Sequence, residues 1–281
     1  MDIERISAFA QNGQGGNPAG VVIGSALPAP ADMQRVAREV GYSETAFAAP
    51  VGKAWVVRYF SPEAEVPFCG HATIALGYAL ARRFGPGRYD LTLAQAKIAV
   101  TAEDQSGDWL ITLNSPPTWS RPLSAPLLAE LFPLFHLTSA DLDPALAPRI
   151  AHAGASHAVL ALGRREVLAA MAYEFEPVKA VMLREGLTTI SLIFRKDEDH
   201  FITRNAFAVG GVVEDPATGA AAAALGGMLV DLGRGAGRFF IRQGEEMGMP
   251  SLLQVQVSGV PGDSVQVSGA ARLVRVALSA P

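Results

Sequence analysis

Short runs rich in β-branched and aromatic residues predict strands in both halves of the chain. Glycine, proline and asparagine separate these runs, as expected for turns. In the first half the runs cover residues 4–9, 19–24, 43–49, 54–60, 89–93, 97–102 and 108–113. In the second half they cover residues 157–162, 187–194, 200–209, 239–243, 252–259 and 264–278.

Helical periodicity appears between the strands. Over residues 31–40, apolar side chains recur on one helical face, which predicts an amphipathic helix. Two more helices are expected around 164–172 and 177–185. Two further predicted helices, 71–83 and 215–233, are rich in alanine and glycine and apolar around nearly their whole circumference. A helix of that kind is buried rather than lying on a surface.

Each half of the chain therefore places one buried, small-residue helix among strands. Small side chains let a helix sit inside a curved sheet, where leucine or phenylalanine on every face would not fit. We expect an α+β fold with two sheets, each wrapped around a central helix. Residues 114–126 contain four prolines and mark the best domain boundary, predicted as an irregular connection.

The composition excludes several classes of protein. The chain has 281 residues, 49% of them hydrophobic, and a formal net charge of −4. Its basic runs are no longer than Arg82-Arg83 and Arg164-Arg165, so no nucleic-acid-binding stripe is expected. The N-terminus lacks a signal pattern, and no uninterrupted apolar stretch reaches the roughly 18 residues that span a membrane. We expect a soluble, cytoplasmic protein that binds neither nucleic acid nor membrane.

Cys69 is the single cysteine, which excludes a disulfide within the chain. It also excludes a racemase that takes two thiols from one chain. Cys69 and His71 could supply two metal ligands, but no second Cys/His pair joins them, so no metal site is expected. The chain has no P-loop, dinucleotide-binding or G-x-S-x-G motif.

Three stretches carry candidate chemistry. Glu44 lies in SETAF, between hydroxyl-bearing and small apolar residues. Residues 68–73 begin one buried helix, and residues 214–219 begin the other. Helix N-termini present unpaired N–H groups and a positive dipole end, which together bind anions. If the two halves pack face to face, a carboxylate substrate could be held between these helix ends, near Glu44.

Each candidate residue also has a simpler explanation. Asp215 followed by Pro216 has the pattern of an N-cap before a first-position proline. His71 could be an ordinary helix-start residue, and Cys69 a small buried hydrophobic residue. Glu44 could be an exposed residue at a sheet edge. The residues alone leave these alternatives open.

Five motifs occur in a fixed order: GNPAGVV (16–22), MQRVAREVGYSETAF (33–47), RYFSPEAEVPFCGHAT (58–73), EDPATGAAAAALGGML (214–229) and RQGEEMGMPS (242–251). In this combination the chain resembles the phenazine-biosynthesis PhzF-like family over essentially its whole length. The resemblance implies a diaminopimelate epimerase-like fold. In that fold two similar domains, each a half-barrel-like sheet around a central helix, enclose the active site in a cleft.

The resemblance also implies how the domains and subunits are organised. The end of the chain is expected to return to the first domain. This gives one domain of 1–115 joined by 270–281, and a second domain of 116–269. A homodimer is expected as well.

For function, the resemblance implies a cofactor-independent isomerase. It would move a proton between carbons of trans-2,3-dihydro-3-hydroxyanthranilate or a similar small carboxylate. Carried over by position, the catalytic residues are Glu44 as general acid/base, His71 and Asp215. The implied substrate-binding residues lie at the two helix starts: Cys69, Gly70, Ala72, Gly219 and Ala220. A partly desolvated carboxylate can act first as base and then as acid.

Two positions depart from the family pattern. Ala220 stands where many relatives carry a serine, which leaves the substrate open. Cys69 stands where alanine is common, while diaminopimelate epimerases place a catalytic thiol at a similar point. An amino-acid or hydroxy-acid racemase or epimerase using Glu44 and Cys69 therefore remains an alternative. A non-catalytic small-molecule binding protein of the same fold is the third interpretation.

Overall fold

The computed structural model describes residues 1–94, 96–105 and 108–274. These residues group into two units. Unit 1 comprises Met1–Leu113 and the chain from Ser268 on, and unit 2 comprises Asn114–Val267. The boundaries expected from the sequence fall at 115/116 and 269/270. Residues 275–281, which belong to the predicted return to the first domain and include the end of the last predicted strand, lie outside the described residues.

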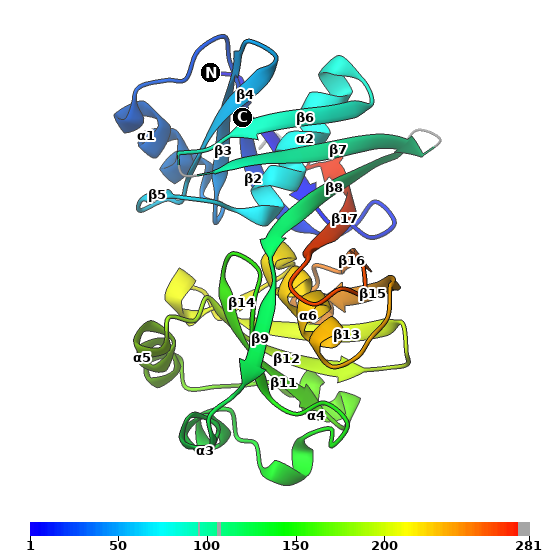
Figure 1. Ribbon diagram of the computed structural model, residues 1–281. Coiled ribbons are helices and arrows are strands. Elements are labelled where there is room, and N and C mark those ends of the chain that lie inside the picture. Colours follow the sequence, from blue (N-terminus) through cyan, green and yellow to red (C-terminus); the bar gives the residue numbers. More distant parts are fainter. Residues whose placement is uncertain (95, 106–107, 275–281) are drawn as a thin grey trace. The chain divides into compact units, whose positions relative to one another are not determined.

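Helix α2 (Gly70–Phe84) lies among the strands of unit 1 (Figure 1), and the pairing of these strands forms a closed ring. In ring order they are β1 (Glu4–Ala8), β2 (Asn17–Ile23), β3 (Thr45–Val51), β4 (Ala54–Phe60), β6 (Gly87–Thr92), β7 (Lys97–Gln105), β8 (Asp108–Pro117) and β17 (Ser264–Leu273). Strand β17 pairs with both β8 and β1, and this pairing closes the sheet into a barrel. The short strand β5 (Glu65–Val66) pairs with β4 just before α2 begins.

Unit 2 also has a sheet that packs around a central helix, α6 (Gly219–Asp231). In sheet order its strands are β9 (Trp119–Pro122), β10 (Arg149–His152), β11 (Ser156–Leu162), β12 (Thr189–Arg195), β13 (His200–Ala206), β15 (Gly237–Gln243) and β16 (Ser251–Val257). The short strand β14 (Glu214–Asp215) pairs with β13 just before α6 begins.

The two units repeat one pairing scheme. Strands β1 to β4 pair antiparallel, parallel and antiparallel in turn, and strands β10 to β13 do the same. In each unit the fourth strand then pairs with a two-residue strand before the buried helix and with a parallel strand after it. The predicted α+β class, with two similar halves each built around a buried helix, is confirmed.

Glycine in the two central helices has a direct steric reason. A Cβ atom added at Gly77 of α2 would lie 2.7 Å from the Ile111 Cγ2 atom. A Cβ atom added at Gly226 of α6 would lie 3.0 Å from the Val265 Cγ1 atom. The strands therefore approach these helices more closely than a larger residue would permit, as the small-residue pattern predicts.

The remaining helices pack on sheet faces that α2 and α6 do not use. The apolar face predicted for α1 (Pro30–Val40) forms a cluster with residues of β2, β3 and β4: Met33, Val36, Ala37, Val40, Val22, Phe47 and Phe60. In unit 2, α3 (Ala125–Leu134), α4 (Arg165–Ala169) and α5 (Phe175–Glu185) share one apolar cluster with β11 and β12. Short 3₁₀ turns are η1 (Ser139–Asp141), η2 (Ala208–Gly210) and η3 (Glu245–Met247).

One expectation about the middle of the chain is wrong, and two elements there were missed. Residues 114–126 are not an irregular connection, because β8 continues through Pro117 and β9 follows at once. Proline is tolerated here since it lies at strand ends, where a missing N–H interrupts little of the ladder. Helix α3 and strand β10 were not predicted at all. Among the described residues, no helix combines the length and apolarity needed to cross a membrane.

Candidate active site

Glu44 is the residue immediately before β3. Its carbonyl oxygen accepts a hydrogen bond of 3.1 Å from the Gly20 N–H, so the backbone at this point is part of the sheet. The Glu44 side chain is 14% exposed, which rules out the exposed-edge interpretation. Within the described residues its Oε2 atom is buried and makes no hydrogen bond. A buried carboxylate oxygen without a hydrogen bond can accept a proton from a bound molecule.

His71 lies beside this carboxylate, in the first turn of α2. Its Nε2 atom is 3.3 Å from Glu44 Oε2 and 3.3 Å from the Ser43 hydroxyl oxygen. The His71 residue is 7% exposed. The imidazole therefore bridges the segment before β3 and the start of α2.

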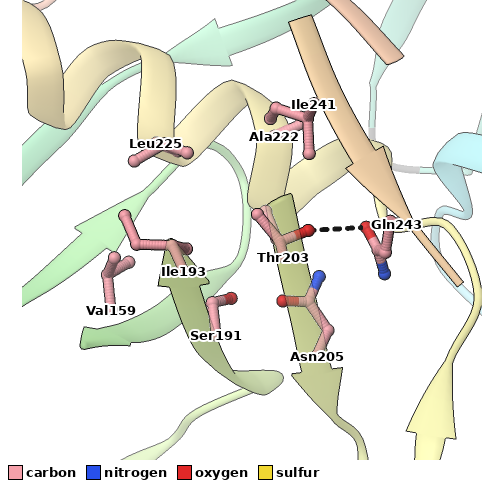
Figure 2. A pocket seen from close by; sticks show the side chains of 10 residues that line it. Val159, Ser191, Ile193, Thr203, Asn205, Ala222, Leu225, Ile241 and Gln243 are labelled. Carbon is pink, nitrogen blue, oxygen red and sulfur yellow. Dashed lines mark hydrogen bonds between the residues drawn. The ribbon is translucent and has the colours of Figure 1, made fainter. Parts of the chain in front are cut away.

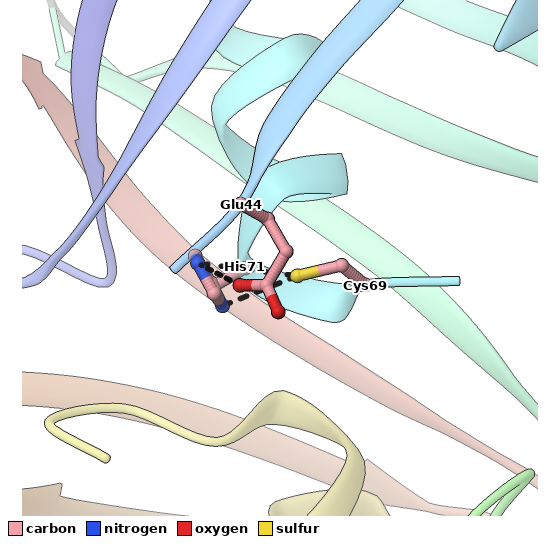
Figure 3. Close-up of side chains that lie close together, drawn as sticks. All are labelled: Glu44, Cys69 and His71. Carbon is pink, nitrogen blue, oxygen red and sulfur yellow. Dashed lines mark hydrogen bonds and ion pairs between the residues drawn. The ribbon is translucent and has the colours of Figure 1, made fainter. Parts of the chain in front are cut away.

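Cys69 is the N-cap residue of α2 and completes the cluster, which Figure 3 shows from close by. Its sulfur lies 3.3 Å from His71 Nδ1 and 3.9 Å from His71 Nε2. Ligand atoms of Glu44, Cys69 and His71 all lie within 4.8 Å of one another. One carboxylate, one thiol and one imidazole thus gather at the N-terminus of a helix.

The backbone at this N-terminus is suited to an anion. The first residues of α2 include Gly70 and Ala72, which the sequence assigned to substrate binding. Within the described residues Cys69 does not cap the helix through its side chain, so first-turn N–H groups stay available. The positive end of the helix dipole adds to their attraction for a carboxylate.

Two buried hydroxyls that sequence reasoning missed hold the N-cap in place. The Thr73 hydroxyl donates to the Cys69 carbonyl oxygen at 2.6 Å, and the Tyr59 hydroxyl contacts the Thr73 hydroxyl oxygen at 2.6 Å. Because the Thr73 proton is used on Cys69, Tyr59 is the donor to Thr73. Burial raises the pKa of Tyr59 above its usual value, which keeps this donor protonated. Threonine four residues after the N-cap was the available signal.

In unit 2 the alternative explanation of Asp215 as an N-cap residue is wrong. Asp215 belongs to β14, and α6 begins at Gly219 with Thr218 as its N-cap. The Thr218 hydroxyl donates to Asp215 Oδ2 at 2.5 Å. Asp215 is 8% exposed, so its carboxylate is held near the start of α6 without capping it. Gly219 is the first residue of that helix, and Ala220, the second, is partly exposed.

Gln243, at the end of β15, fixes this segment and was not predicted as a site residue. Its Nε2 atom donates to the Asp215 carbonyl oxygen at 2.6 Å and to the Thr218 hydroxyl at 3.2 Å. Its Oε1 atom accepts from the Thr218 N–H at 3.2 Å. The glutamine of the RQGEEMGMPS motif was the signal available in the sequence.

The structure therefore brings together some predicted site residues within each unit. Unit 1 joins Glu44, Cys69 and His71 with the start of α2, and it adds Ser43. Unit 2 joins Asp215 with the start of α6 through Thr218 and Gln243. Both helix starts combine an acidic or basic side chain with first-turn N–H groups.

A family model described as phenazine biosynthesis-like protein matches residues 6–277. The chain belongs to this family. The predicted membership of the phenazine biosynthesis-like family is thereby confirmed.

Individual relatives agree with the family match. The Escherichia coli (strain K12) protein named uncharacterized isomerase YddE is 33% identical over 233 residues, which cover 81% of this chain and 78% of the relative. Curated relatives in this family are named isomerases, which supports the predicted enzyme class.

Solved structures share the fold. The Bacillus anthracis phenazine biosynthesis protein of the PhzF family matches with a TM-score of 0.87, at 23% identity, over 98% of both chains. A probable proline racemase from Agrobacterium radiobacter K84 matches with a TM-score of 0.66, at 15% identity, over 99% of this chain and 93% of its own. At these identities the likeness concerns the fold, and it agrees with the predicted epimerase-like architecture.

Proposed function

We propose that this member of the phenazine biosynthesis-like family is an isomerase that moves a proton between carbons of a small carboxylate substrate. The observation that carries the proposal is the buried Glu44 Oε2 atom, which makes no hydrogen bond among the described residues and lies 3.3 Å from His71 Nε2. Glu44 removes a C–H proton and returns it to another carbon of the same molecule.

The neighbours of Glu44 have distinct roles in this proposal. His71 orients the carboxylate, and Ser43 and Cys69 orient the imidazole through Nε2 and Nδ1. The first-turn N–H groups of α2, near Gly70 and Ala72, hold the substrate carboxylate. Asp215, held by Thr218 and Gln243, and the start of α6 at Gly219 and Ala220 stay candidate contacts for polar groups of the substrate.

The proposed substrate is small and carboxylated and has a C–H bond made acidic by a neighbouring unsaturated group. trans-2,3-Dihydro-3-hydroxyanthranilate belongs to this class. Ala220 offers no hydroxyl at a position where many relatives carry serine, so a substrate with one fewer polar contact there is favoured. We propose no cofactor for the reaction, because the carboxylate supplies the base.

The alternative of a two-base racemase with Glu44 and Cys69 meets a geometric difficulty. A carbon held between two bases, each about 3–3.5 Å away, requires bases about 6–7 Å apart. The ligand atoms of Glu44 and Cys69 lie within 4.8 Å of each other. This spacing favours Glu44 acting on one face of the substrate, with Cys69 as a neighbour of His71.

The test is solvent deuterium incorporation followed by NMR. Wild-type protein and Glu44→Gln would be incubated in D₂O with dihydrohydroxyanthranilate and with a panel of small amino and hydroxy acids. Loss of a general base lowers a rate by about 10²–10⁴-fold, and we expect a loss of that size in Glu44→Gln. Glu65→Gln is the matched control, because Glu65 is an exposed carboxylate of the same unit, paired with Arg58.

Three outcomes are informative. Exchange equally fast in wild type and Glu44→Gln would contradict the role of Glu44. Exchange lost on Cys69→Ala as fully as on Glu44→Gln would restore the racemase alternative. Ligand binding without exchange across the whole panel would favour the non-catalytic binding protein.

A further inference from the structure

We infer that Glu44, Cys69 and His71 form a site for one thiophilic divalent cation of the Zn²⁺ class. A bound cation would occupy the atoms that acid/base chemistry uses and so act as an inhibitor. The sequence argued against a metal site because no second Cys/His pair accompanies Cys69 and His71. The structure supplies the third ligand from another segment, since Glu44 lies beside them.

The donor set is the one that zinc prefers. A cysteine sulfur, a histidine nitrogen and a carboxylate oxygen are each common zinc ligands, and a sulfur donor disfavours Mg²⁺ and Ca²⁺. Each of the three residues offers one such atom within 4.8 Å of the other two. Cys69 and His71 are buried and the Glu44 side chain is 14% exposed, so the atoms face a site with little solvent.

Two of the three distances between the ligand atoms are close to those around a tetrahedral ion. Zinc bonds of about 2.0–2.3 Å at tetrahedral angles place nitrogen and oxygen ligands about 3.4 Å apart, and sulfur about 3.6 Å from either. In the structure His71 Nε2 is 3.3 Å from Glu44 Oε2 and 3.9 Å from Cys69 Sγ. Movements of a few tenths of an ångström would bring these two distances to the tetrahedral values, whereas the Glu44–Cys69 pair, within 4.8 Å, would close by up to about 1.2 Å.

The ligands are held by regular elements rather than by loops alone. Cys69 and His71 are the N-cap and second residue of α2, and the Tyr59–Thr73 chain fixes the Cys69 carbonyl. Glu44 is fixed through its own carbonyl oxygen, which accepts from Gly20 N–H. Supporting groups of this kind orient metal ligands and raise affinity. The buried Oε2 atom of Glu44, which lacks a hydrogen bond within the described residues, gains a partner when the ion binds.

Three protein ligands leave the fourth corner for water or for a substrate carboxylate. With the ion in place, Glu44 Oε2 carries a metal bond and is not available to accept a proton. The metal site does not rest on the proposed isomerase activity, whereas its inhibitory effect does, because both use Glu44.

Cobalt spectroscopy of the metal-free full chain tests the site. Cys69 is the single cysteine, so a thiolate-to-cobalt charge-transfer band has one possible source. We expect Co²⁺ to give this band at one equivalent, and Zn²⁺ to remove it by displacing Co²⁺, as expected from the usual affinity order. Calorimetric titration with Zn²⁺ alone gives the stoichiometry and the dissociation constant.

The variants make the assignment specific. Loss of an outer partner of a metal ligand typically weakens binding about 10–100-fold, so loss of a ligand in Glu44→Gln or His71→Asn should weaken Zn²⁺ binding by at least that factor. Cys69→Ala should abolish the cobalt band. His200→Gln is the control, because His200 is an exposed histidine beside a carboxylate, with Nδ1 2.8 Å from Asp197 Oδ1, and should bind Zn²⁺ as wild type does. Circular dichroism shows whether each variant is folded.

No cobalt band at one equivalent, or a Zn²⁺ dissociation constant unchanged in both folded Glu44→Gln and folded Cys69→Ala, would overturn the inference. These readouts need no substrate, so they are independent of whether the isomerase proposal holds. The two proposals also differ at Cys69. Cys69 supplies a metal ligand in this inference and orients His71 in the proposed isomerase, so Cys69→Ala is judged by the loss of the cobalt band and not by deuterium exchange.

Discussion

The starts of α2 and α6 have the same surroundings and different chemistry. Each follows a two-residue strand and a proline, Pro67 in unit 1 and Pro216 in unit 2, and each begins at a glycine. At the N-cap, unit 1 has Cys69 where unit 2 has Thr218. Two residues later, unit 1 has His71 where unit 2 has Ala220. The repeated backbone supplies two helix ends, and the side chains decide which groups each end carries: a thiol and an imidazole at α2, and a hydroxyl beside the Asp215 carboxylate at α6.

A second difference concerns the side chains that the fourth strand of each unit directs toward its central helix. The strand pairing places Tyr59 of β4 at the position that Asn205 occupies in β13. Tyr59 bonds to Thr73 of α2, whereas Asn205 faces a small pocket that Ala222 of α6 also lines (Figure 2). The pocket has a volume of about 10 Å³, and Asn205 Oδ1 has no hydrogen-bond partner among the described residues. A volume of this order is close to the minimum that holds one water molecule.

The largest expected difference concerns two equivalent ion pairs. Arg204 and Glu214 of unit 2 correspond to Arg58 and Glu65 of unit 1, since both pairs join the fourth strand to the short strand. Arg204→Met leaves the Glu214 carboxylate buried and unpaired, and we expect the free energy of unfolding to fall by about 3–5 kcal/mol. Arg58→Met should cost less than about 1 kcal/mol, because the Glu65 side chain is 38% exposed.

Urea unfolding of both variants checks this contrast. Equal losses in Arg204→Met and Arg58→Met would show that burial does not distinguish the pairs. The Arg204 guanidinium also donates to the Ala169 carbonyl oxygen at 2.8 Å, and this bond adds to its loss.

A second prediction uses pH. His157 of β11, fully buried and 2.7 Å from the Thr189 hydroxyl, corresponds by register to Gly20 of β2 opposite Thr45. Burial, with a smaller effect from His152, lowers the pKa of His157 to about 3 from 6.5. The unfolded chain protonates below 6.5 while the folded chain does not, so stability is complete above 6.5 and is lost as the pH falls toward 3. The loss is about 1.4 kcal/mol per pH unit in this window.

Unfolding free energies at pH 6.5 and 4.5 test the prediction, with His157→Gln as the comparison. The glutamine does not titrate, so the variant should lack about 2.3 kcal/mol of the wild-type decrease in the free energy of unfolding. His200→Gln is the control, because His200 is exposed. An unchanged pH dependence in His157→Gln would mean that other groups cause the decrease.

Much of this architecture follows from local pattern, and the reasons are physical. Alanine and glycine around the whole circumference of α2 and α6 predict burial, because only small residues fit inside a curved sheet. Helix α3 was missed since Pro126 and Pro133 within it weigh against a helix. The closure of the barrel by β17 could not be predicted from local pattern, because Ile6 pairs with Leu273 at the other end of the sequence.

The candidate site divides in the same way. The site residues were predicted from the family motifs. The N-termini of α2 and α6 were predicted as anion sites from the local sequence pattern. The supporting residues Tyr59, Thr73 and Gln243 did not stand out, because their partners are carbonyl and hydroxyl groups whose positions only the folded chain defines. Glu44 was not recognised as a third metal ligand, since it precedes Cys69 by a whole hairpin.

The third prediction compares the central helices. Gly77→Ala places a methyl group 2.7 Å from the Ile111 side chain, and overpacking of that kind costs about 1–3 kcal/mol. Gly226→Ala meets three valine methyl groups at 3.0–3.2 Å, each less close than the Ile111 contact, so the helix propensity gained by alanine in either helix, about 1 kcal/mol, offsets more of the strain at Gly226. We expect Gly77→Ala to lower the melting temperature and Gly226→Ala to leave it nearly unchanged. The reverse order would show that the sheet of unit 1 yields more readily than that of unit 2.

The smallest effect is expected at Tyr59. Tyr59→Phe removes the donor to the Thr73 hydroxyl and should lower the free energy of unfolding by about 1 kcal/mol. Because Thr73 still donates to the Cys69 carbonyl oxygen, the N-cap should stay in place. Urea unfolding measures the free energy of unfolding. The rate of deuterium exchange into the substrate reports whether the site at the N-cap is intact. Loss of exchange out of proportion to the loss of stability would assign Tyr59 a positioning role.

Strand β17 has a consequence for the order in which the protein is made. The ribosome completes strands β1 to β8 long before residues 264–273 are synthesised. Until then the two edge strands of the first sheet, β1 and β8, lack their pairing partner β17. At about 5–20 residues per second, synthesis of residues 114–273 takes about 8–30 s. During that interval the first-made half of the chain exposes two unpaired strands that could pair with another nascent chain. The N-terminal unit is therefore the last to finish folding, and its yield depends on how fast unit 2 folds between its two halves.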